Sequence, residues 1–183
     1  MDRSRKMEKL TLTRPRILPG DILAVQGQSW MSRQIMRTTG GSCSHVGLFL
    51  SGGKEPLIIE ALTRVVTHPL TEALVDSKKA WILHPLNIDM YQRLNIMHHA
   101  RALIGGKYGY VRFFLQFADC LTHTRFFSTH LTLPGQPICS MIVAYPYGQE
   151  GLYFGHTFQS LSPAEIFDFA QSHDKFYKIW ELK

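Results

Sequence analysis

The chain has 183 residues, of which 45% are hydrophobic and 19% are charged, and these values are ordinary for a globular protein with a core. No apolar run approaches the roughly 20 residues that cross a bilayer, and residues 1–9 lack the apolar centre of a secretory signal. Three cysteines without paired spacing argue against a disulfide framework. The sequence therefore predicts a cytoplasmic protein. Export by a route that uses no cleaved signal stays open.

The formal net charge is +6, and positive charge is concentrated near the start of the chain. The basic residues there are Arg3, Arg5, Lys6, Lys9, Arg14 and Arg16. We interpret residues 1–16 as a basic tail and residues 17–183 as a single domain. Such a tail is attracted to anionic surfaces. Because the chain contains no helix-turn-helix, zinc-finger or RNA-recognition pattern, nucleic acid is not an expected partner.

Apolar and turn-forming residues alternate along the chain in a way that predicts strands and helices in turn. The predicted strands are residues 21–25, 44–50, 57–62, 80–86 and 176–182, and the predicted helices are residues 29–37, 89–104 and a helix that begins at Ser162. The expected apolar stripe of the second helix consists of Leu94, Met97, Ala100, Leu103 and Ile104. These elements predict an α+β fold in which helices pack on an antiparallel sheet.

The strands at 44–50 and 57–62 are joined by a glycine-containing connector that favours a hairpin. If Leu50 pairs with Leu57, His45 and Glu60 become diagonal neighbours on one face, and Gly47 leaves room between them. A slip of one residue would place them on opposite faces. A carboxylate on an apolar strand needs a partner when it is buried, and orienting a histidine is one such role.

Cys139 stands at the start of an apolar run that ends at Pro146, and this pattern predicts a helix that begins at the cysteine. The N-terminus of a helix favours a thiolate over a thiol, because it carries unpaired N–H groups and partial positive charge. Cys139 is therefore the candidate nucleophile, His45 the candidate base and Glu60 the candidate orienting group.

Five motifs together resemble the circularly permuted papain-like amidases of the YiiX/YaeF type, which are related to the NlpC-type cell-wall peptidases. They are Leu18-Pro19-Gly20-Asp21-Ile22-Leu23, Ser44-His45-Val46-Gly47, Ile59-Glu60-Ala61, Ile138-Cys139-Ser140 and Ser162-Pro163-Ala164-Glu165-Ile166. The order His, Glu, Cys is the permuted one, and the match runs over most of the chain. The resemblance implies a permuted papain-like, NlpC-type fold.

The resemblance also implies a cysteine peptidase or amidase that cleaves a peptide or cell-wall peptide bond through an acyl-enzyme, without a cofactor. Cys139 would be the nucleophile, His45 the base and later the acid, and Glu60 the orienting group. Tyr108, in a glycine-rich segment that resembles one of the family, would contact the substrate carbonyl or the oxyanion. The backbone N–H of Cys139 would be the other donor.

Several alternatives stay open. Phenylalanines between residues 112 and 136, together with the basic tail, favour lipid acyl hydrolysis or transfer. A ligand-binding module that has lost turnover is the other alternative. Cys43 competes as nucleophile, but glycines before it indicate a loop. Cys120 and His123 form a Cys-x-x-His pair, but the second pair of a zinc site is missing, so no metal site is expected.

Overall fold

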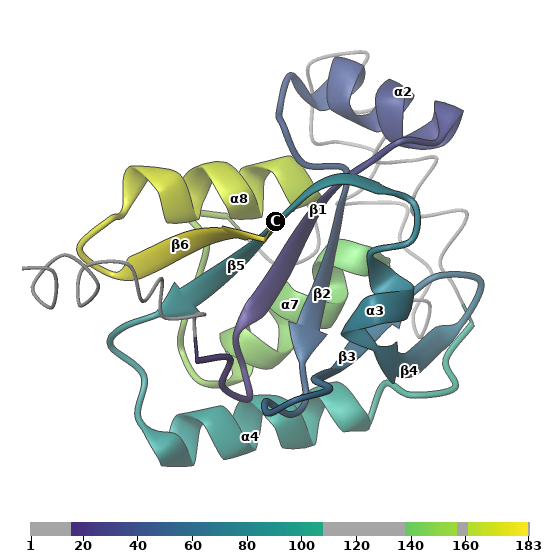
Figure 1. Cartoon of the computed structure of the whole chain (residues 1–183). Coiled ribbons are helices and arrows are strands. Elements are labelled where there is room, and N and C mark those ends of the chain that lie inside the picture. The colour runs from purple at the N-terminus through teal and green to yellow at the C-terminus, as the bar shows by residue number, and fades with distance from the viewer. Residues whose placement is uncertain (1–15, 108–137, 157–160, 183) are drawn as a thin grey trace, which may run out of the picture.

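The computed structural model describes residues 16–107, 138–156 and 161–182, and within them a six-stranded antiparallel sheet has the strand order β4-β3-β2-β1-β5-β6 (Figure 1). The strands are β1 (Ile22–Gly27), β2 (His45–Phe49), β3 (Leu57–Ala61), β4 (Val65–Pro69), β5 (Ser77–Pro85) and β6 (Tyr177–Leu182). Together with the helices, this sheet confirms the predicted α+β class. Residues 1–15, most of the predicted basic tail, lie outside the described residues.

Helices cover both faces of the sheet. The described helices are α2 (Trp30–Thr39), α3 (Leu70–Ala73), α4 (Met90–Arg101), α7 (Cys139–Gln149) and α8 (Pro163–Ser172). Buried side chains of α4, α7 and α8 share one core with one face of the sheet, whereas α3 packs on the other face (Figure 1). In the described part of the chain, no helix has both the length and the hydropathy needed to cross a membrane.

Three helix starts follow directly from local sequence. Ser29 caps α2 by accepting a hydrogen bond from the Ser32 backbone N–H. Asp89 and Ser162 each form a reciprocal capping box with the third residue of the helix that follows, α4 and α8 respectively. The predicted boundaries at these three positions are confirmed.

Other predictions are corrected by the structure. The prediction missed β4 and α3, and Pro146 lies inside α7 rather than at its end. The helix continues past the proline because Tyr147 is fully buried and its hydroxyl donates to the Gly20 carbonyl. The apolar stripe predicted for α4 is partly wrong. Leu94 is 53% exposed, whereas Arg93 and Ile96, which were not part of the predicted stripe, are buried.

Arg93 is buried because it serves a sealed ionic cluster, which we call the Asp21 cluster (Asp21, His84 and Arg93). His84 Nδ1 and an Arg93 guanidinium nitrogen lie 2.8 and 2.9 Å from the same oxygen of Asp21. The second oxygen accepts the Leu18 backbone N–H, and Arg93 also donates to two backbone carbonyls. The cluster fastens the start of β1 to the end of β5 and to α4.

Candidate active site

The β2–β3 hairpin has the register that the sequence predicted. Leu48 pairs with Ile59, and the Leu50 backbone N–H donates to the Leu57 carbonyl over 2.8 Å. This register puts His45 and Glu60 on one face, where His45 Nε2 donates to Glu60 Oε1 over 2.8 Å. The Glu60 side chain is only 3% exposed, so the histidine provides the partner that a buried carboxylate requires.

Gly47 lies between these two side chains and permits their close approach. A Cβ atom at this position would lie 2.7 Å from Glu60 Cγ and 2.9 Å from Ile58 Cγ2. Both distances are shorter than atomic contact allows, so a side chain at residue 47 would displace Glu60. The sequence-based prediction that glycine leaves room here is confirmed.

Cys139 is the first helical residue of α7, as predicted. The N-cap residue Ile138 makes no side-chain capping hydrogen bond, so the amide groups of the first turn are not capped by it. The thiol is largely buried, at 7% exposure, but it borders a pocket. A sulfur at the start of a helix lies where the partial positive charge of the helix favours a thiolate.

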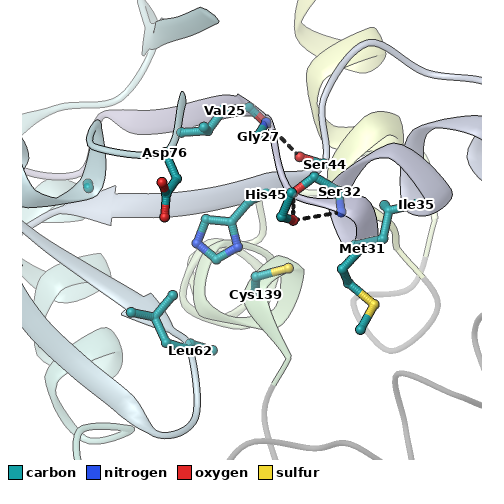
Figure 2. Close-up of a pocket in the computed structure, with 13 residues that line it drawn as sticks. Val25, Gly27, Met31, Ser32, Ile35, Ser44, His45, Leu62, Asp76 and Cys139 are labelled. Carbon is teal, nitrogen blue, oxygen red and sulfur yellow. Dashed lines mark hydrogen bonds between the residues drawn. The ribbon is translucent and has the colours of Figure 1, made fainter. Parts of the chain in front are cut away.

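His45 reaches from the start of β2 to the start of α7, where its ring lies next to the Cys139 side chain (Figure 2). Burial alone would lower the pKa of His45. The hydrogen bonds with Cys139 and Glu60, and the negative charges of both groups, instead raise this pKa from 6.5 to about 10. Because His45 Nε2 already interacts with Glu60, the ring nitrogen that remains for the Cys139 thiol is Nδ1. The arrangement favours the imidazolium form of His45.

The carboxylate of Glu60 contacts a second histidine that the sequence analysis missed. His68 of β4 places Nε2 2.6 Å from Glu60 Oε2, in an ion-pair contact that does not have the geometry of a hydrogen bond. Burial would raise the pKa of Glu60, but the hydrogen bond to His45 and the positive charges of both histidines lower it overall. The β-branched run Val65-Val66-Thr67 was the signal for the strand that carries His68.

A pocket of about 360 Å³ opens beside Cys139 and His45 (Figure 2). Most of the other described side chains that line it are apolar, from β1, α2, β3, α3 and the residue after β3: Val25, Met31, Ile35, Ala61, Leu62 and Ala73. The polar groups of the wall come from Ser29, Ser32, Ser44 and Asp76. A small organic group could thus lie against both the sulfur and the imidazole.

The other candidate residues from the sequence are a second cysteine, a tyrosine and a possible metal-binding pair. Cys43 is fully buried, donates to the His45 carbonyl over 3.0 Å, and burial raises its pKa to about 12, so it is an inert thiol. Tyr108, Cys120, His123 and the aromatic segment 112–136 lie outside the described residues. Among the residues that are described, no group of three or more His, Cys, Asp or Glu side chains is arranged to hold a metal ion.

The fold is similar to a solved structure. No family model matches this sequence, and no curated protein matches it. The crystal structure of the metalloprotein YiiX from Escherichia coli O157:H7 (DUF1105) matches 77% of this chain and 71% of its own chain, with a TM-score of 0.61 and 20% sequence identity. The chain shares the fold of YiiX. At this identity the likeness concerns the fold alone, and the roles of Cys139, His45 and Glu60 stay predictions.

Proposed function

We propose that the protein is a thiol hydrolase that cleaves an amide or related acyl bond. One observation carries this proposal: the Cys139 side chain, at the first turn of α7, lies next to the His45 ring (Figure 2), and His45 is hydrogen-bonded to Glu60, beside a pocket. A nucleophile, a base and an orienting group in contact are the parts that covalent catalysis needs.

The proposed reaction begins with attack of the Cys139 thiolate on the substrate carbonyl carbon. The oxyanion that forms is stabilised by N–H groups at the start of α7, including that of Cys139. The His45 imidazolium gives its proton to the leaving nitrogen, the C–N bond breaks, and a thioester remains. Neutral His45 then takes a proton from water, the hydroxide attacks the thioester, and Cys139 leaves as thiolate with release of the acid.

Two further points support a permuted papain-like enzyme of the amidase type. The candidate residues occur in the chain order His45, Glu60, Cys139, and the fold is that of YiiX, the type of protein that the sequence motifs resemble. By that resemblance, the substrate class is a peptide or cell-wall peptide.

Lipid acyl hydrolysis or transfer is the second candidate. The observation that favours it is the predominantly apolar wall of the pocket, to which Met31, Ile35 and Leu62 contribute. An acyl chain gains free energy from burial against such side chains, at about 25 cal/mol per Å² of apolar surface.

The test is turnover of three substrate classes by the full chain: peptides, soluble cell-wall peptides and phospholipid vesicles. Cys139→Ser should reduce turnover of the true substrate at least about a thousandfold. Cys43→Ala is the matched control, because it removes a thiol that lies outside the proposed reaction. Equal turnover by wild type and Cys139→Ser would refute the proposal, and ligand binding without any turnover would favour a binding module.

A further inference from the structure

Glu60 lies between two histidines from different strands. Its Oε1 accepts from His45 Nε2 at 2.8 Å, and its Oε2 lies 2.6 Å from His68 Nε2. His68 is itself mostly buried, at 13% exposure of its side chain, and its Nδ1 lies 3.8 Å from a carboxylate oxygen of Glu72. A continuous line of contacts therefore runs from Cys139 through His45, Glu60 and His68 to Glu72 at the surface.

We propose that His68 is a positioning residue for the Cys139–His45 pair, and this inference rests on the proposed function. His68 contacts the oxygen of Glu60 that His45 does not use. It thereby holds the carboxylate in the orientation that presents Oε1 to His45, and it keeps that carboxylate charged in a buried site.

The register of β3 and β4 brings the histidine to this position. Glu60 pairs with Val66, so His68, two residues further along β4, is a diagonal neighbour of Glu60 on the same face. The pairing of Ile58 with His68 is part of the same ladder. The contact is therefore built into the sheet and does not depend on a loop.

The charges around Glu60 explain why a second histidine matters. A carboxylate that is 3% exposed loses most of its hydration, and burial favours its protonated form. Protonated Glu60 would no longer stabilise the imidazolium of His45, and Cys139 would lose its positive partner. The groups that face His68 are Glu60 from β3 and Glu72 from α3, with His45 of β2 beyond Glu60.

A purely structural role makes a different prediction. If His68 only tied β4 to β3, its loss would lower stability and leave the pH dependence of Cys139 chemistry unchanged. If His68 positions Glu60, its loss would move that pH dependence to higher pH, because Glu60 would take up a proton more readily. The pH profile thus separates the two roles.

The experiment is the rate of Cys139 alkylation by iodoacetamide as a function of pH in the full chain, with each modified cysteine identified by mass spectrometry. In His68→Leu and in His68→Asn, whose amide is too short to reach Glu60, the profile should move up by about one pH unit. The rate near pH 6 should then fall about tenfold. His68→Gln keeps an N–H donor near the position of Nε2 and should recover part of the rate.

Controls separate this inference from the proposed function. Thr67→Ala alters an exposed neighbour in β4 and should leave the profile unchanged. If His45→Ala abolishes fast alkylation but His68→Leu and His68→Asn keep the wild-type profile, the proposed function stands and the inference about His68 is wrong. If wild-type Cys139 reacts no faster than an ordinary thiol, the proposed function fails and the inference falls with it.

Discussion

In the part of the chain that the structure describes, two carboxylates are buried in surroundings that look alike at first. Glu60 and Asp21 are both almost inaccessible to solvent, and each has a histidine nitrogen 2.8 Å from one oxygen. Each carboxylate also contacts a second basic side chain, His68 or Arg93. Both therefore meet the requirement that a buried charge be paired.

Asp21 and Glu60 differ in the groups that their basic partners contact in turn. Besides Asp21, Arg93 donates to the carbonyls of Pro19 and Pro85, so the Asp21 cluster ends in backbone groups. The partners of Glu60 are instead two imidazoles, from His45 and His68. One of them, His45, continues to a thiol and a pocket. The surroundings therefore distinguish a buried carboxylate that only joins elements of the fold from one that lies beside a thiol and a pocket.

The largest effect is expected when the Asp21 cluster is broken. Arg93→Met removes the guanidinium and leaves Asp21 with incomplete pairing, which should lower the free energy of unfolding by about 3–5 kcal/mol. Urea unfolding monitored by circular dichroism measures this loss. Glu60→Gln, the matched change in the other cluster, should cost less than about 1.5 kcal/mol while it slows Cys139 alkylation. Equal losses of stability in the two variants would contradict the distinction.

A smaller effect is expected from a methyl group placed between His45 and Glu60. In Gly47→Ala the new Cβ would overlap Glu60 Cγ, so the carboxylate must move away from His45. Alkylation of Cys139 should slow about tenfold, and stability should fall by roughly 1–3 kcal/mol. Gly53→Ala is the control, since its positive φ gives backbone strain while no atom lies within 4 Å of the added Cβ. Equal alkylation rates in both variants would show that Gly47 has no role in the site.

The smallest effect is the pH dependence of stability that the Glu60 pair contributes. Folding raises the pKa of His45 from 6.5 to about 10, so this contribution is complete below pH 6.5 and is lost as the pH rises through about 10. Folding lowers the pKa of Glu60 from 4.5, so its contribution is present above pH 4.5 and is lost as the pH falls through the lowered value.

The measurement compares melting temperatures of the wild type and the double variant His45→Ala, Glu60→Gln over this pH range. The difference between the two should be greatest between pH 4.5 and 6.5 and should shrink toward either extreme. A difference that grows as the pH rises through 10 would have the wrong sign and would contradict the assigned charges.

Local sequence was sufficient for the parts of the site that depend on neighbouring residues. The hairpin that aligns His45 with Glu60 follows from a short glycine-containing connector and the alternation of the strands. The start of α7 at Cys139 follows from the apolar run that begins there. Capping residues fixed the starts of α4 and α8 for the same reason.

The missed features depend on residues that are distant in sequence. His68 joins the site only through the pairing of β3 with β4, a strand that the sequence analysis did not identify. Arg93 is buried because it donates hydrogen bonds to Asp21 and to two backbone carbonyls. From the sequence alone, a charged residue in a helix is expected to face solvent. Pro146 is tolerated inside α7 because the helix end is fixed by Tyr147 against Gly20.

The most direct test of the central claim compares two cysteines in one molecule. Cys139 and Cys43 are both buried, but only Cys139 has an imidazole partner and a pocket beside it. Iodoacetamide labelling at about pH 6.5, where an unperturbed thiol is mostly protonated, should modify Cys139 rapidly and Cys43 hardly at all, and His45→Ala should remove the fast reaction. Labelling of Cys139 at the rate of Cys43, or a fast reaction that survives His45→Ala, would contradict the account.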